Sequence, residues 1–477
     1  MSTPSLASGP EGRDALRPLL DTVLDALEAG AYARGGPLPA GGPDAVTARV
    51  HAAVGDVLPQ DGDPDALRVL VRALAEGSAD PAHPHCAAHL HCPPLAVATA
   101  ADLAASVLNP SLDSWDQAPA ASALEALVTR ALAREAGAAD AVVTTGGTES
   151  NHLALLLARE RHGAGVRLVC GENAHHSLPR AAWLLGLPDP VVVPAPAGTL
   201  DPAALDEALT TLPGPHLVAA TAGTTDAGLV DPLPEIAALC TAHSARLHID
   251  AAYGGGLLFS DRHREQLTGL ERAHSITLDL HKLGWQPVAA GLLAVRHPRD
   301  LAALKHHADY LNADDDTAAG LPDLLGRSLR TTRRPDILKI AVTLKSLGRS
   351  GLGALVDQVC GRAREFADLV QNRPAFELHD RPAISTVLFR PTHVTDDTVA
   401  EVRRSLLHQG RAVLGRARLD GRLWLKATLL NPDTRPADLA ALLTLVEEAT
   451  ETVTEEAEKA AAPAPEADAL VEGPTPR

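Results

Sequence analysis

Seven short apolar runs, separated by helical stretches between about residues 120 and 295, limit the folds open to this chain. Short runs rich in β-branched residues and separated by helices are typical of a mostly parallel sheet with helices on its faces. The pattern predicts an α/β domain whose functional groups lie beyond the carboxyl ends of the strands. The runs are AVVTT (141–145), VRLVC (166–170), PVVVPA (190–195), HLVAAT (216–221), ARLHID (245–250), SITLDL (275–280) and GLLAVR (291–296).

The sequence on either side predicts further units. Before the α/β part, apolar spacing indicates helices at about 14–29, 65–75 and 96–107, with a Gly/Pro-rich stretch at 35–43. After the α/β part, the sequence predicts a long loop at 297–335, of the kind that often forms a lid, and then a helix at 336–347. A smaller α+β part then has helices at 352–371, 396–409 and 436–449 and strands at 384–390 and 423–430.

These patterns divide the chain into four parts. The first is an N-terminal helical segment (1–100), the second the large α/β domain (101–350) and the third a small α+β domain (351–450). The fourth, 451–477, is acidic, lacks an apolar period and is expected to be a disordered, solvated tail.

Composition excludes several functional classes. The 477 residues carry a formal net charge of −18, which argues against nucleic acid or an anionic membrane as a partner. No apolar run approaches the ~20 residues of a membrane helix. The N-terminus has no basic segment followed by an apolar one, so we expect a cytoplasmic protein. The five scattered cysteines are expected to be reduced.

A segment rich in histidine and cysteine lies at PAHPHCAAHLHCPP (81–94). Its spacing matches no standard zinc arrangement, and its four prolines favour a surface or interface loop over a metal site. We therefore predict no metal.

The first segment that looks chemical is TTGGTESN (144–151), between a predicted strand and a predicted helix. Gly146 and Gly147 let the backbone close on a ligand, and the helix start offers free N–H groups to an anion. Thr148 adds a hydroxyl donor. The segment is either a phosphate cup or a helix start capped by Thr148 or Ser150.

Two further segments follow predicted strands. Asp250 ends one strand and precedes two alanines, which suits a carboxylate facing a flat cationic heterocycle, or one that caps the next turn. Lys282 follows another apolar strand, where desolvation lowers the pKa of an amine and favours Schiff-base chemistry. The alternative for Lys282 is a salt-bridged strand end. His281 beside it could donate to a phosphate or transfer a proton.

The three segments together point to one cofactor. Pyridoxal 5′-phosphate needs an anion site, a partner for its pyridine nitrogen and a lysine that forms an imine. A phosphate cup, Asp250 and Lys282 occur in this order along the chain.

Ten motifs between about His83 and Ala449 resemble those of the group II pyridoxal-phosphate-dependent amino-acid decarboxylases, which have the fold type I (aspartate aminotransferase-like) architecture. They are HPHCAAHLHCPP (83–94), NPSLDSWDQ (109–117), TTGGTESN (144–151), AHHS (174–177), AGTTDAGLVDPL (222–233), HIDAAYGG (248–255), SITLDLHKLGWQP (275–287), ADYLN (308–312), SLRTTRRPDILK (328–339) and LLNPDT (429–434).

The resemblance implies a seven-stranded, mostly parallel large domain and roles for individual residues. Lys282 forms the Schiff base, Asp250 pairs with the pyridine nitrogen, and His175 stacks on the ring and handles the substrate carboxylate or a proton. The resemblance also implies a homodimer in which the N-terminal segment embraces the partner. The remaining cofactor-binding residues are Ala252 on the other ring face, Thr225 near the 3-hydroxyl, and Gly147, Thr148, Asp279 and His281 at the phosphate.

Within the family the chain resembles most the bacterial L-2,4-diaminobutyrate and siderophore-type lysine/ornithine decarboxylases, through HKLGWQP, HHADYLN and SLRTTRRPDILK. The implied reaction converts a diamino acid into an amine and CO₂. The alternatives are an aromatic or acidic substrate, or decarboxylation-dependent oxidative deamination on the same scaffold. Carboxylates expected near the pocket mouth, or else on a solvated face, are Asp113, Asp116, Asp309, Asp314, Asp315 and Asp316.

Three positions depart from the family pattern. Cys86 stands where members of this branch carry an aromatic residue, and His91 where they carry asparagine. Leu324 stands where aromatic decarboxylases place a tyrosine that donates a proton. Tyr310 and His175 are then the candidate proton donors.

Overall fold

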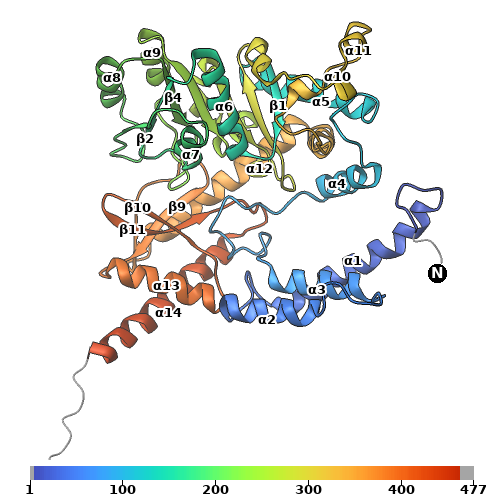
Figure 1. The fold of residues 1–477 in the computed structure, drawn as a ribbon. Coiled ribbons are helices and arrows are strands. Elements are labelled where there is room, and N and C mark those ends of the chain that lie inside the picture. Colours follow the sequence, from blue (N-terminus) through green and yellow to red (C-terminus); the bar gives the residue numbers. More distant parts are fainter. Residues whose placement is uncertain (1–4, 462–477) are drawn as a thin grey trace, which may run out of the picture.

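All seven predicted strands of the large domain form, and they join in one sheet in this computed structural model, which describes residues 5–461 (Figure 1). The strand order is β1-β7-β6-β5-β4-β2-β3, and β7 runs in the opposite direction to the other six strands. The prediction of a mostly parallel α/β sheet is confirmed. The strands are β1 (Asp140–Thr144), β2 (Arg167–Gly171), β3 (Val191–Val193), β4 (His216–Thr221), β5 (Arg246–Ala251), β6 (Ser275–Asp279) and β7 (Gly291–Val295).

Helices cover both faces of this sheet. Alternate residues of β4 enter different apolar clusters, Val218 and Ala220 on one face and Leu217 and Ala219 on the other. A strand buried on both sides needs a continuous apolar run, which is what the sequence shows. The covering elements are α5 (Pro119–Glu135), α6 (Gly147–His162), α7 (Ser177–Leu184), α8 (Pro202–Thr211), α9 (Leu233–Ala242) and the short turns η1 (Gly254–Phe259), η2 (Arg264–Leu267) and η3 (Leu270–Arg272).

The predicted loop at 297–335 contains short helical turns rather than irregular chain alone. They are η4 (Pro298–Leu304), α10 (Asp309–Asn312), α11 (Asp314–Ala318) and η5 (Leu325–Arg327).

The small domain has the predicted α+β character. Its sheet is antiparallel in the order β10-β11-β9-β8, and the edge strands β8 and β10 were not predicted. β10 has the sequence GRARL, whose two arginines hide its short apolar pattern. The elements are α12 (Ile337–Gln371), β8 (Phe376–Leu378), β9 (Thr386–Pro391), α13 (Asp396–His408), β10 (Gly415–Leu419), β11 (Arg422–Thr428) and α14 (Pro436–Ala461).

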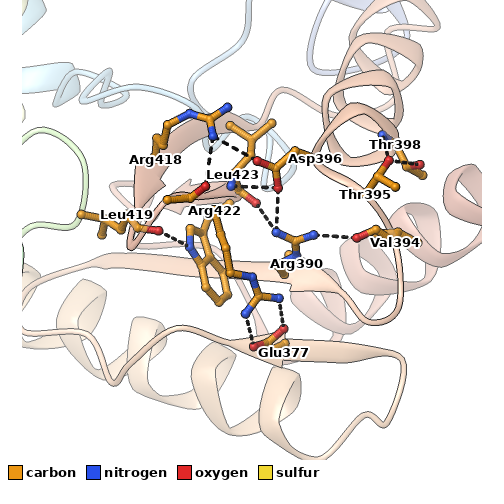
Figure 2. Close-up of polar contacts among 12 residues, drawn as sticks. Glu377, Arg390, Val394, Thr395, Asp396, Thr398, Arg418, Leu419, Arg422 and Leu423 are labelled. Carbon is orange, nitrogen blue, oxygen red and sulfur yellow. Dashed lines mark hydrogen bonds and ion pairs between the residues drawn. The ribbon is translucent and has the colours of Figure 1, made fainter.

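Hydrogen bonds between charged side chains connect the strands of this small sheet (Figure 2). Asp396 at the start of α13 accepts hydrogen bonds from Arg390 of β9 at 3.0 Å and from Arg418 of β10 at 3.1 Å. Arg422 of β11 makes two bonds of 2.6 Å to Glu377 of β8. The network therefore joins all four strands to α13.

The N-terminal segment is helical as predicted, and Figure 1 shows α1, α2 and α3 as a group below the large domain. α2 was missed because its start, Gly41-Gly42-Pro43, reads as a linker. The structure instead uses Gly41, at φ 94°, as the N-cap and Pro43 in the first turn, where a missing N–H costs nothing. The helices are α1 (Gly12–Arg34), α2 (Gly42–Val54), α3 (Ala66–Gly77) and α4 (Ala96–Leu108).

Two predicted domain boundaries fall inside helices. The boundary at 100 lies in α4, and the boundary at 350 lies in α12. Gly348, at φ 64°, interrupts α12 between the two helices predicted there. Helices, not flexible linkers, therefore join the parts.

The prediction of a disordered tail from residue 451 is wrong for 451–461, because α14 continues to Ala461. Val446, Ala449 and Val453 continue one buried helical stripe beneath a mostly charged sequence. The rest of that predicted tail, 462–477, lies outside the described residues. Over 5–461, no helix is long and apolar enough to cross a membrane.

Candidate active site

A cavity of about 280 Å³ opens where β1, β4, β5 and β6 end. The structure brings all nine predicted site residues into its lining. They are Gly147, Thr148, His175, Thr225, Asp250, Ala252, Asp279, His281 and Lys282. The lining also contains residues that were not predicted as site residues, namely Leu90, Thr145, Gly146, Thr221, Gly223 and Tyr253.

The glycines after β1 form a narrow cup. α6 begins at Gly147 and its N-cap is Gly146, so the alternative of a cap by Thr148 or Ser150 is wrong. Gly146 has φ 151°, and a Cβ there would lie 3.0 Å from Cε1 of His281. Only glycine combines this backbone angle with so close an approach. The helix start is thus open to the cavity.

Asp279 organises the opposite side of the cup. Its Oδ2 lies 3.0 Å from Nζ of Lys282 and 3.5 Å from Nε2 of His281, and it accepts from the backbone N of Gly147 at 3.1 Å. Burial lowers the pKa of His281, with Asp279 opposing that effect. Lys282 therefore forms the salt bridge of the alternative interpretation, and it also lines the cavity.

Asp250 uses its two oxygens differently. Oδ1 accepts from the backbone N of Ala252 at 3.0 Å, which is the turn-capping contact of the alternative interpretation. Oδ2 accepts from Nδ2 of Asn151 in α6 at 2.7 Å. Both neighbours are donors, an arrangement that suits an ionised carboxylate.

His175 precedes α7 and lies against the ring of His176, with centroids 4.2 Å apart. Its Nδ1 lies 2.7 Å from Oγ of Ser177. Burial lowers the pKa of His175, which favours the neutral form of the ring. A neutral imidazole in the cavity can donate through one nitrogen only.

The small domain closes one wall. Nζ of Lys426 in β11 donates to the backbone O of Thr225 at 2.9 Å. The hydroxyl of Tyr253 lies 2.8 Å from Oγ of Ser385 and 3.1 Å from Oγ1 of Thr386. Burial raises the pKa of Tyr253 to about 12, so the phenol stays neutral. The cavity shape thus depends on both domains.

Several residues singled out in the sequence do not line the cavity. The expected acidic residues at the pocket mouth are absent from its described lining, and Asp116 and Asp309 are exposed. Tyr310 is 83 % exposed, and Leu324 is buried against Leu112 and Ala118. Of the two candidate proton donors, only His175 lines the cavity.

The histidine- and cysteine-rich segment contributes Leu90 to the cavity and little else. Nε2 of His85 bonds the backbone O of Asp438 at 3.1 Å. In the part of the chain that the structure describes, no three His, Cys, Asp or Glu side chains come together to hold a metal ion, and the five cysteines are free.

A buried polar set behind Asp250 was missed as a unit. It consists of Asn151, Ser177, His248, Ser275 and Thr277. A signal was present in the sequence. Polar residues at alternate positions in otherwise apolar strands, as in HID and SITLD, point to one face.

A lysine after β6, an aspartate in β5 and a glycine cup after β1 surround one cavity, and this set of groups defines an enzyme that works through a bound aldehyde cofactor. A family model, the pyridoxal-dependent decarboxylase conserved domain, matches residues 60–392. The chain belongs to this family and is a pyridoxal-phosphate-dependent amino-acid decarboxylase.

Individual relatives agree with the family assignment. An L-2,4-diaminobutyrate decarboxylase of Rhizobium meliloti is 40 % identical over 402 residues, which are 80 % of this chain and 81 % of that protein. One of Acinetobacter baumannii is 32 % identical over 411 residues, covering 78 % and 81 %. The glutamate decarboxylase domain of a diaminobutyrate-pyruvate transaminase and L-2,4-diaminobutyrate decarboxylase from Vibrio parahaemolyticus superposes with a TM-score of 0.82 at 30 % identity, covering 94 % and 98 %.

The cavity fits pyridoxal phosphate. Two buried polar atoms in its lining, Oδ1 of Asp279 and Oγ1 of Thr221, have no hydrogen-bond partner within residues 5–461. A Cβ at Gly147 would lie 3.1 Å from Cβ of Ala252, so a side chain at residue 147 would crowd this part of the cup. Amine, carboxylate and anion-binding groups are all present at the strand ends.

Proposed function

We propose that the protein removes the α-carboxylate of an L-diamino acid, with L-2,4-diaminobutyrate as the principal substrate. The observation that carries this proposal is the 40 % identity to a relative named for that substrate, over 80 % of this chain. The structural neighbour from Vibrio parahaemolyticus, whose title names the same substrate, supports it.

In this proposal Lys282 binds the cofactor aldehyde, and Asp250 holds a proton at the ring nitrogen. The positively charged ring supplies the electron sink for the electrons left when CO₂ departs. His175 donates a hydrogen bond within the cavity, and Ala252 leaves room beside the cup. These roles rest on the placement of the side chains around one cavity.

Gly147, Thr148 and His281 are proposed to hold the phosphate through N–H and O–H groups. Asp279 carries the same sign of charge as a phosphate, so we assign it an indirect role. Its contacts to the backbone N of Gly147 and to His281 orient these two donors. This refines the direct contact implied by the family resemblance.

We infer that the chain forms a homodimer through its N-terminal helices. In α1 and α3 several leucines stay exposed, and α2 and α3 bury no residue. A partner would remove these apolar side chains from water, with each Å² contributing about 25 cal/mol. The exposed leucines of α1 and α3 are Leu19, Leu24, Leu27, Leu67, Leu70 and Leu74.

The dimer is tested by light scattering on Leu24→Glu/Leu74→Glu, for which we expect monomers. Leu184→Glu, at an exposed leucine of α7, serves as the matched control and should stay dimeric. A wild-type monomer at micromolar concentration would contradict the inference.

The substrate is tested by competition. The holoenzyme receives diaminobutyrate, ornithine, lysine, tyrosine, DOPA and glutamate at equal concentration, and the amines, CO₂, ammonia and peroxide are measured. We expect the diamino acids to react first and no ammonia or peroxide to form. Preference for an aromatic or acidic substrate would overturn the diamino proposal, and stoichiometric ammonia and peroxide would indicate oxidative deamination.

A further inference from the structure

The amide of Asn151 makes four hydrogen bonds inside the protein, and its side chain is fully buried in α6. Nδ2 lies 2.7 Å from Oδ2 of Asp250 and 2.9 Å from Oγ of Ser177. Oδ1 lies 2.8 Å from Oγ1 of Thr277 and 3.0 Å from Nε2 of His248. The amide therefore uses both of its donors and both of its acceptor positions.

Hydrogen-bond chemistry determines which way this amide faces. An ionised Asp250 can only accept, so Asn151 must present its NH₂ group to that carboxylate. Oδ1 then faces His248, whose Nε2 must carry a proton. Burial lowers the pKa of His248 to about 4, so the ring has this one proton, and its Nδ1 accepts from the hydroxyl of Ser275 at 2.9 Å.

The second N–H of Asn151 connects this hydrogen-bond network, through Ser177, to His175 in the cavity lining. Oγ of Ser177 receives that N–H and directs its own proton to Nδ1 of His175, 2.7 Å away. The backbone N of Ser177 also points to Nδ1, at 3.3 Å. Nδ1 is thus an acceptor, and the neutral ring of His175 carries its proton on Nε2. No residue among 5–461 hydrogen-bonds Nε2, which leaves that N–H for a ligand in the cavity.

We propose that Asn151 is a positioning residue that orients the carboxylate of Asp250 and, through Ser177, holds His175 in the tautomer with the proton on Nε2. The cavity then meets His175 as a hydrogen-bond donor, which suits an oxygen atom of a bound molecule. Its consequence for catalysis rests on the proposed roles of Asp250 and His175. The tautomer itself is a property of the chain and is measurable without cofactor or substrate.

The sharpest variant is Asn151→Asp, because it keeps the size and one acceptor of the side chain and removes the NH₂ group. If the new carboxyl group is protonated, its single O–H can donate a hydrogen bond to Asp250 or to Ser177, but not to both. Asn431→Asp is the matched control. Asn431 is 8 % exposed, donates to the backbone O of Ala82 at 2.7 Å and accepts from the backbone N of Asp433 at 3.0 Å, outside the cavity lining.

The primary measurement is ¹⁵N NMR of the full chain labelled in its histidine rings, without cofactor, with the signal of His175 assigned through His175→Gln. We expect one neutral tautomer, protonated on Nε2, in the wild type and in Asn431→Asp. In Asn151→Asp we expect a mixture of tautomers. We also expect the dissociation constant for pyridoxal phosphate to rise about tenfold or more in Asn151→Asp, against less than about twofold in the control.

Ser177→Ala tests the bonds to His175 separately from the bond between Asn151 and Asp250. It also provides a test if Asn151→Asp does not fold. It removes the hydroxyl contact to Nδ1 of His175, whereas the backbone N–H at 3.3 Å and the bond from Asn151 to Asp250 remain. We expect the ¹⁵N signal of Nδ1 of His175 to shift, because this nitrogen loses its shorter hydrogen bond, while the visible spectrum of the bound cofactor stays unchanged. A wild-type His175 protonated on Nδ1, or an Nδ1 signal that is the same in Ser177→Ala as in the wild type, would overturn the proposal. A wrong substrate assignment would leave all these readouts intact, so the two failures are distinguishable.

Discussion

Asp250 of β5 and Thr277 of β6 are partners in the register of neighbouring parallel strands, and both side chains reach Asn151 of α6. The preceding pair on the same face, His248 and Ser275, is also polar and also bonded. The strand period therefore builds a polar support under the carboxylate that the proposal places at the cofactor ring.

Asp250→Asn should keep the fold and bind the cofactor but lower the turnover number by several orders of magnitude. The amide cannot stabilise a proton on the ring nitrogen as a carboxylate does. The measurement is kcat with the preferred substrate, together with the absorbance of the bound cofactor. Asp309→Asn, at an exposed aspartate, is the control. A loss below about tenfold, ~1.4 kcal/mol in the barrier, would mean that Asp250 is not the pyridine partner.

The buried ring of His248 should make stability fall in acid. Its pKa is about 4 in the folded protein against an ordinary value of 6.5, so the unfolded chain binds more protons between these values. The contribution is fully present above pH 6.5 and decreases as the pH falls toward 4, by up to ~1.4 kcal/mol per pH unit.

Urea unfolding at a series of pH values between 7.5 and 5 measures this slope. His248→Gln should reduce the slope, whereas His51→Gln, at an exposed histidine of α2, should leave it unchanged. Equal slopes in the wild type and in His248→Gln would contradict the interpretation of His248 as a neutral, buried group.

The end of α14 should show a sharp boundary in stability. Ending the chain at Thr454 removes, among the described residues, only exposed ones at 455–460, so the melting temperature should change by less than about 4 °C. Val453→Asp places a charge where the native side chain is only 8 % exposed. This substitution should lower the melting temperature by more than the truncation does. The reverse order would show that the helix end packs differently.

The sequence was sufficient for most of the fold. Strands buried on both faces are continuous apolar runs, and Gly348 separates the two predicted helices within α12. Local patterns failed where another contact decides the structure. Three buried side chains continue α14 beneath an acidic sequence, and Gly41 caps α2 from what reads as a linker.

The residues that line the cavity could be predicted from the sequence, but the hydrogen bonds among the buried side chains behind them could not. Lys282, Asp250 and the glycine cup carry types and spacings that the cofactor chemistry requires. Asn151 joins Asp250 to Ser177 across 99 and 26 positions of sequence, and only the packing of α6 on β5 and β6 creates that contact. For the acidic residues expected at the pocket mouth, the sequence predicted a placement that the structure does not show. The charge of a residue alone does not determine where its side chain lies in the fold.

The replacement of Lys282 by alanine tests the account most directly. The full-length Lys282→Ala protein is mixed with pyridoxal phosphate, and its visible absorbance and the CO₂ released from diaminobutyrate are recorded beside Lys345→Ala, an exposed lysine of α12. We expect Lys282→Ala to lose both the absorbance of the lysine-bound cofactor and turnover, while Lys345→Ala keeps both. Decarboxylation by Lys282→Ala at a rate near that of the wild type would contradict the role proposed for Lys282.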